Sequence, residues 1–209
     1  GEVFHRYILG VYDLYSRLNA KFPHVLFESC ASGGGRFDPG MLYYAPQAWV
    51  SDDSDAVERL KIQYGTSFCY PISSVGAHVS AVPNHQINRT TPLSTRANVA
   101  CFGAFGYELD LEHMTKEEKE IASNLITQFK EIEPMIQNGD YYRITAPGDE
   151  NNAVIWSFVS KDKTNVLVCG VVLRKYPNPP ITLLHLRGLD PQKKYKETLT
   201  GQIYTGAVL

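Results

Sequence analysis

Up to about Pro134, the chain alternates short apolar segments with helical patterns, and this alternation limits the folds that it can adopt. The segments are nearly all apolar, which is typical of strands that are buried on both faces. Such strands, when helices separate them, favour a parallel sheet that is covered by helices. Four segments fit this description, and they occupy residues 24–28, 47–51, 67–70 and 98–102.

Three helices are expected around these strands. The first has apolar residues at spacings of three and four over residues 4–18, which places them on one face. A second helix is expected over about residues 55–64, where Asp55 is suited to cap the first turn. A third is expected to begin at Thr115, because Glu118 follows at the spacing of a capping box.

After Gly139 the pattern changes to strands and turns without helices. We therefore expect two domains, over residues 1–135 and 139–209, of which the second is a small antiparallel β-sandwich. Its strands are expected over residues 141–145, 153–160, 165–173 and 181–186, with a hairpin turn at 161–164.

The length of 209 residues is short for a complete (β/α)8 barrel, which needs about 250 residues. The chain opens inside a helical pattern with no strand before it, and it closes in a short strand or turn over residues 204–209. Four parallel strands in this length fit half of such a barrel. We expect an α/β half-barrel followed by an all-β part, with both ends of the chain truncated.

Composition excludes several classes of protein. Twenty basic and 22 acidic residues give a net charge of −2, which argues against a broad basic surface for nucleic acid. No segment approaches 18 consecutive apolar residues, and no signal-peptide pattern is present, so no membrane partner is expected. Four widely spaced cysteines without a C-x-x-C pair indicate reduced thiols and a cytoplasmic location.

The densest polar segment, residues 28–38, follows directly on the first predicted strand and contains three successive glycines from Gly33. In an α/β sheet this position is the carboxyl-terminal edge, where ligands bind. Glycines allow the backbone to approach a ligand closely. A flexible loop and a phosphate-binding loop are the alternatives, although the segment lacks the Gly-Lys-Ser/Thr ending of a P-loop.

A second polar segment, residues 51–55, follows the next predicted strand and carries three carboxylates. Asp55 fits the cap of the following helix, and Asp53 fits either a cap or a site. Asp52 lies too far upstream to cap the same turn, so it is the better candidate for a general acid or base. Metal binding by the three carboxylates is an alternative, although no histidine lies nearby in the sequence.

Other chemistry-bearing residues give weaker patterns. His78 and His85 are seven residues apart in a segment with a proline, which is no metal-ligand spacing, so loop packing or pocket lining is expected. No G-x-S-x-G motif is present, so a serine hydrolase would lack its nucleophile. The residues alone therefore indicate a barrel-type enzyme acting on a carbohydrate or small metabolite, with Asp52 as acid or base.

Several segments in order resemble the signature motifs of the bacterial α-galactosidases of glycoside hydrolase family 36. The resemblance is continuous over about residues 1–135 and weaker beyond. It rests on CASGGGRFD at 30–38, SDDSDA at 51–56, YPISS at 70–74 with HVS at 78–80, and FGYELD at 105–110.

This resemblance implies retaining hydrolysis of terminal α-linked galactose, as in melibiose and raffinose, and needs no cofactor or metal. The four strands would be the fifth to eighth of the barrel, which makes residues 1–135 its C-terminal half and the chain the C-terminal part of the enzyme. Asp52 matches the acid/base residue of the family. Cys30 and Gly33 match galactose-pocket residues, Ser32 and Arg36 belong to the same signature, Asp53 adjoins the acid/base, and Trp49 either lines the pocket or packs beside it.

The nucleophile of the family lies in a Lys-Trp-Asp motif after the fourth strand, and this sequence contains no such motif. The resemblance therefore implies a fragment that is inactive alone and whose partners are an α-galactoside and the missing N-terminal half. A homo-oligomer is also implied. The alternative is a non-catalytic sugar-binding or assembly module derived from such an enzyme.

Overall fold

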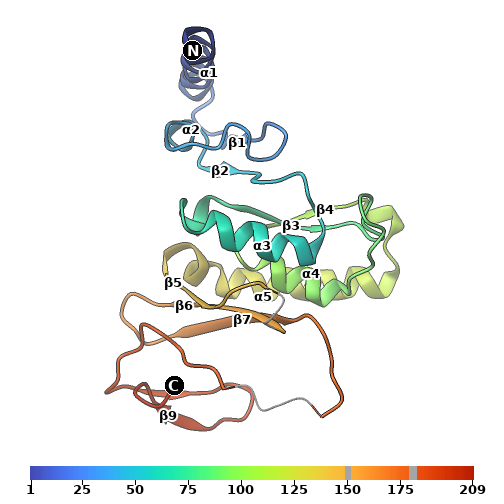
Figure 1. Ribbon diagram of the computed structural model, residues 1–209, viewed down its shortest axis with the longest axis vertical. Coiled ribbons are helices and arrows are strands. Elements are labelled where there is room, and N and C mark those ends of the chain that lie inside the picture. Colours follow the sequence, from blue (N-terminus) through green and yellow to red (C-terminus); the bar gives the residue numbers. More distant parts are fainter. Residues whose placement is uncertain (149–151, 179–182) are drawn as a thin grey trace.

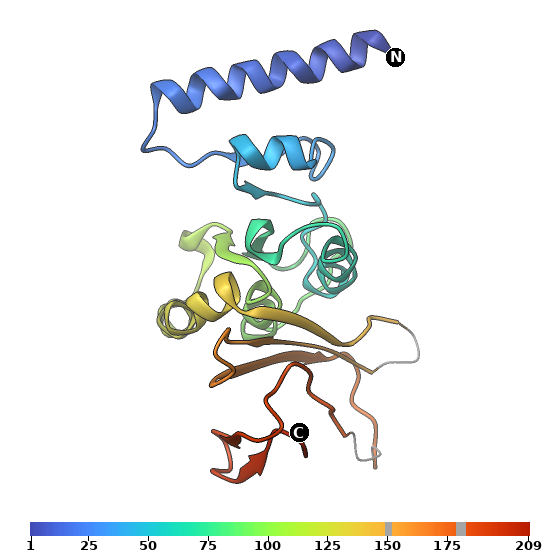
Figure 2. The same cartoon turned by 90° about the vertical axis from the view of Figure 1, so that its left-hand side faces the viewer.

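The computed structural model describes residues 1–148, 152–178 and 183–209, and it arranges their helices and strands in successive layers (Figure 1). Helix α1 (Glu2–Lys21) lies at one end of the long axis, and the last strands lie at the other (Figure 2). No helix in these ranges is both long enough and apolar enough to cross a membrane.

Four parallel strands follow one another in chain order. Strand β1 (Glu28–Ser29) pairs with β2 (Gln47–Ala48), and β3 (Gly76–Ser80) pairs with β4 (Ala104–Glu108). A single parallel bridge between Ala48 and Val75 joins the two pairs. The described strands form no closed barrel, although their parallel order agrees with the α/β expectation.

Two of the four predicted strand positions are wrong, and the first, 24–28, overlaps its strand only at Glu28. Residues 98–102 form the end of helix α4 (Leu93–Ala100) and the turn after it, and residues 67–70 form the turn after helix α3 (Ala56–Thr66). A short apolar run fits a buried helix as well as a strand, and α4 buries Ala97 and Ala100. The true strands, β3 and β4, follow each segment by a few residues.

The parallel sheet has two different faces. Ala77 and Val79 of β3 lie on the face that packs against α4. The opposite face carries Trp49 and His78, whose rings are stacked, and we call it the polar face. Its other residues are Glu28, which accepts a hydrogen bond from Gln47, and Glu108, which accepts one from Ser80. The four parallel strands are shorter, or contain more polar residues, than the apolar segments predicted from the sequence.

Helix capping follows the sequence closely. The Asp55 carboxylate accepts hydrogen bonds from the backbone N–H groups of Val57 and Glu58, as predicted for the N-cap of α3. Thr115 and Glu118 form the predicted capping box at the start of α5. Helix α5 covers Lys116–Asn138. Three short helices were not predicted: α2 (Pro39–Tyr44), η1 (Ile72–Ser74) and η2 (Leu111–His113).

After α5 the chain forms an antiparallel sheet of β5 (Asp140–Thr145), β6 (Ala153–Val159) and β7 (Val166–Val172). These three strands and the turn between β6 and β7 confirm the sequence prediction. Residues 181–182 of the fourth predicted strand lie outside the described residues, and 183–186 form no strand. A hairpin of β8 (Lys194–Lys196) and β9 (Ile203–Thr205) follows.

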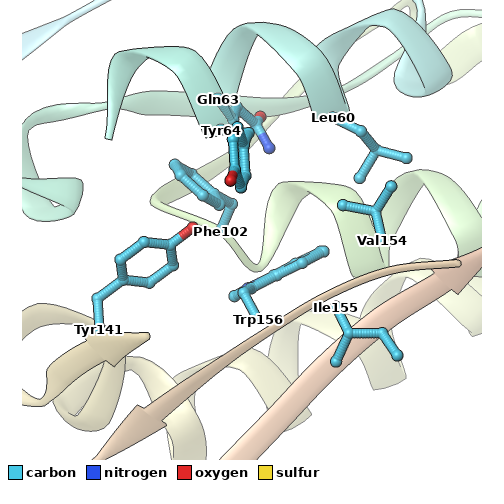
Figure 3. Close-up of a pocket in the computed structure, with 8 residues that line it drawn as sticks. All are labelled: Leu60, Gln63, Tyr64, Phe102, Tyr141, Val154, Ile155 and Trp156. Atoms are coloured by element: carbon cyan, nitrogen blue, oxygen red, sulfur yellow. The ribbon is translucent and has the colours of Figure 1, made fainter. Parts of the chain in front are cut away.

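The largest core joins the helices to this antiparallel sheet. Leu60 of α3, Phe129 and Ile136 of α5, and Trp156 and Phe158 of β6 belong to one cluster of buried side chains. The cavity between α3 and β6 (Figure 3) is lined mostly by apolar and aromatic side chains and holds about 10 Å³, the space of one water molecule. It is a packing defect of the core, too small for a sugar.

Candidate active site

The first two polar segments of the sequence meet in the structure. Gly33 has a φ of +68°, and a Cβ atom added to it would lie 2.5 Å from Ser51 Cα and 2.8 Å from Asp52 N. A Cβ atom on Gly34 would lie 2.8 Å from Val50 O. We call residues 30–36 the glycine loop and residues 51–55 the aspartate turn. The glycine loop therefore lies backbone to backbone against Val50 and the start of the aspartate turn. Only glycine permits this approach.

The glycine loop has a defined conformation. Ala31 N–H donates to Gly33 O at 3.0 Å, and Gly35 N–H donates to Ala31 O at 3.1 Å. Ser32 is exposed at the tip with a φ of +47°, and Cys30 is exposed before it. Because two of its N–H groups are used within the loop, they are not free for a phosphate. A turn held by its own hydrogen bonds also argues against the flexible-loop alternative.

Arg36 ties this loop to the first helix. Its Nη2 donates to Cys30 O at 3.2 Å and its Nη1 donates to the hydroxyl of Tyr7 at 3.3 Å. Its Nε is buried and has no hydrogen-bond partner among the described residues. The side chain is thus engaged in holding the loop, and a direct role toward a substrate stays a prediction.

The three carboxylates of the aspartate turn have different surroundings. Asp55 is 3% exposed, caps α3 and forms an ion pair with Arg89. Asp53 accepts a hydrogen bond from Asp55 N–H at 3.0 Å. The side chain of Asp52 is exposed, and within the described ranges no hydrogen bond or ion pair reaches its carboxylate. Asp52 is therefore the carboxylate of this turn that is free to meet a ligand.

The segment after β3 holds the aspartate turn from the side. Buried Asn84 donates from its amide to Ser54 Oγ at 3.3 Å, and Gln86 Nε2 lies 3.5 Å from Asp52 O. Arg89 in the same segment pairs with Asp55. His85 is exposed between these contacts, so the sequence expectation of a loop residue agrees with its place.

Trp49 is packed on both sides rather than open to solvent. It is 7% exposed, its ring lies 4.4 Å from that of His78 at 12°, and the guanidinium carbon of Arg59 lies 4.2 Å from its ring centre. Burial lowers the pKa of His78, which the nearby charges of Glu28 and Glu108 only partly offset. At neutral pH His78 is therefore a neutral stacking partner of Trp49.

Arg59 was not predicted as a buried or functional residue, although its spacing in the sequence indicates burial. Ala56, Leu60 and Gln63 of α3 are buried and recur at helical spacing, and Arg59 falls on the same face. A charged side chain in an amphipathic helix is usually assigned to the solvent side. The spacing, rather than the residue type, identifies it as buried.

No group of three or more His, Cys, Asp or Glu side chains within the described ranges is arranged to hold a metal ion. The geometry instead offers one open carboxylate beside a glycine loop. Such a carboxyl group can donate or accept a proton at a bound substrate.

Two family models match the chain. Residues 1–139 match the Melibiase family, and residues 153–209 match the C-terminal domain of glycosyl hydrolase family 36. Alpha-galactosidase AgaA of Geobacillus stearothermophilus is 50% identical over 195 residues, which are 93% of this chain and 27% of the relative. Alpha-galactosidase Mel36A of Lactobacillus acidophilus is 46% identical over 99% of this chain and 28% of its own length.

Solved structures agree with these matches. The galactosidase domain of the α-galactosidase–sucrose kinase AgaSK superposes with a TM-score of 0.94 at 46% identity, covering 98% of this chain and 28% of that one. An AgaA variant solved in complex with raffinose superposes with a TM-score of 0.92 at 49% identity. The match covers 97% of this chain and 28% of the AgaA chain. The chain spans just over a quarter of the length of these relatives. It belongs to the melibiase family and corresponds to the C-terminal part of the glycoside hydrolase family 36 α-galactosidases.

Proposed function

We propose that this chain supplies the acid/base residue of a retaining α-galactosidase that removes terminal α-linked galactose from oligosaccharides of the melibiose and raffinose type. The observation that carries the proposal is the open carboxylate of Asp52 beside the glycine loop, within motifs of the α-galactosidase family. Relatives over the whole chain are named α-galactosidases, and one was solved with raffinose.

The reaction needs two carboxyl groups. A retaining glycosidase forms a glycosyl-enzyme on one carboxylate, while the other protonates the leaving oxygen and then activates water, and the two lie about 5–5.5 Å apart. Asp52 takes the second role. The sequence contains no Lys-Trp-Asp motif, so the nucleophile is proposed to come from the part of the complete enzyme that precedes these residues, and this chain alone is proposed to be inactive.

The proposed galactose contacts come from the two segments that meet at Gly33. Exposed Cys30 and Ser32 present polar groups, and the absence of a side chain at Gly33 keeps the loop against the acid/base residue. Asp53 adjoins Asp52. Trp49 and Arg36 contribute through packing and through the shape of the loop, because their described contacts are with protein groups.

The four parallel strands are proposed to be strands five to eight of a (β/α)8 barrel, over residues 1–135, and residues 139–209 to be an incomplete β-sandwich. The polar face of the sheet would then line the barrel interior, where the N-terminal half completes it. A homo-oligomer of the complete enzyme and a cytoplasmic location are part of the same proposal. All four cysteines are free thiols, which fits a reducing compartment.

The stereochemistry of the product tests this function. The complete enzyme should release galactose from melibiose and raffinose, and the α-anomer should appear first when the reaction is followed by proton NMR. A retaining double displacement restores the starting configuration. First appearance of the β-anomer would contradict the assignment of Asp52 to a retaining pair, and absence of turnover on α-galactosides would contradict the substrate class.

A further inference from the structure

Helix α3 buries a cation that the proposed chemistry leaves without a role. Arg59 is 2% exposed, and no carboxylate in the described ranges forms an ion pair with it. Burial lowers its pKa to about 10, against the opposing charges of Asp53 and Glu108, so it remains protonated at neutral pH. Burying an unpaired charge is costly unless hydrogen bonds compensate for the lost hydration, and this guanidinium donates hydrogen bonds to backbone carbonyls.

The guanidinium joins strand β3 to the aspartate turn that follows β2. Its Nη1 donates to Ser51 O at 3.1 Å, and its Nη2 donates to Gly76 O at 2.9 Å. Beyond the bridge between Ala48 and Val75, the described backbone of β2 and β3 shows no further ladder. The planar fork of Arg59 therefore connects β3 to the aspartate turn, beyond the point where β2 and β3 stop pairing.

The same side chain also fixes the residues just before the acid/base position. Its guanidinium carbon lies 4.2 Å from the ring centre of Trp49, and its Nη1 holds the carbonyl of Ser51. Asp52 is the next residue. The other described tie to the backbone of Asp52 comes from Gln86, at 3.5 Å and on the surface.

We propose that Arg59 is a positioning residue: by holding Ser51 O and Trp49, it fixes the backbone from which Asp52 projects toward the leaving oxygen. This proposal rests on the acid/base role proposed for Asp52. Lysine cannot replace arginine here, because an ammonium group lacks the rigid fork that reaches two carbonyl oxygens at once. A misplacement of about 1 Å can lower a rate by about 100-fold.

Arg59→Lys in the complete enzyme tests the proposal by comparing two substrates. Raffinose has a poor leaving group that needs protonation, whereas p-nitrophenol leaves without it. We expect kcat/KM on raffinose to fall by about 10- to 100-fold through kcat, with KM within about twofold, and kcat/KM on p-nitrophenyl α-galactoside to change much less. Rates are taken per folded molecule, as measured by near-UV circular dichroism.

Lys61→Met is the matched control, because Lys61 lies on the exposed side of the same helix and pairs only with Glu58 among the described residues. This variant should leave kcat/KM unchanged on both substrates. Arg59→Gln, which retains a neutral donor, gives a second measurement if the lysine variant does not fold. Equal losses on both substrates, a rise in KM alone, or unchanged rates per folded molecule would overturn the proposal. An unmodified enzyme that hydrolyses neither substrate would instead refute the proposed function.

Discussion

Asp52→Asn in the complete enzyme should lower kcat/KM on raffinose by about 10²- to 10⁴-fold, the range that a general acid contributes. The asparagine amide cannot protonate the leaving oxygen. The kcat/KM on p-nitrophenyl α-galactoside should fall far less, because p-nitrophenol leaves as a stable anion without protonation. Steady-state kinetics on both substrates measure the difference.

Asp55→Asn provides the control within the same turn. Asparagine is an equally good N-cap, so α3 keeps its first hydrogen bonds, while the ion pair with Arg89 is lost. Asp55→Asn should change kcat/KM equally on the two substrates, because it removes no proton transfer. Equal losses for Asp52→Asn on both substrates would show that Asp52 is not the acid.

Gly33→Ala should reduce activity on both substrates by about 100-fold or more. The backbone at Gly33 lies in the left-handed region, and the added Cβ would lie 2.5 Å from Ser51 Cα, so either the glycine loop or the aspartate turn must move. The left-handed conformation costs a non-glycine residue about 1–2 kcal/mol before the clash is counted. Kinetics and urea unfolding of the complete enzyme measure the two effects.

Gly65→Ala makes the same chemical change without the clash. Gly65 lies in α3, and a Cβ atom there would meet no atom within 4 Å. This variant should keep full activity and gain about 0.5–1 kcal/mol of stability, because alanine favours a helix. Full activity of Gly33→Ala would contradict the contact between the glycine loop and the aspartate turn as the basis of the site.

Local sequence patterns predicted the helices better than the parallel strands. The apolar spacing of α1, the Asp55 cap and the capping box at Thr115 are all present, because each depends on residues a few positions apart. Strands β3 and β4 were missed because one side of each carries residues such as His78 and Gly106, which break the apolar pattern. Helix α4 was mistaken for a strand because its end is a short apolar run.

The site was partly predictable for a different reason. Residues that follow parallel strands gather at one edge of the sheet, so the proximity of the glycine loop and the aspartate turn follows from the order of elements. The close approach at Gly33 and the bridging contacts of Arg59 depend on the tertiary packing of α3 against β2 and β3. The spacing in α3 indicates that Arg59 is buried, but it does not indicate which groups Arg59 contacts.

The proposed function requires that this chain carry the acid/base carboxylate but not the nucleophile. An assay of the purified 209-residue chain on p-nitrophenyl α-galactoside tests this directly, with the chain alone and after mixing with the preceding N-terminal part of the enzyme. We predict no turnover by the chain alone and turnover once that N-terminal part is added. Turnover by the chain alone would contradict the account, because both carboxylates would then lie within these residues.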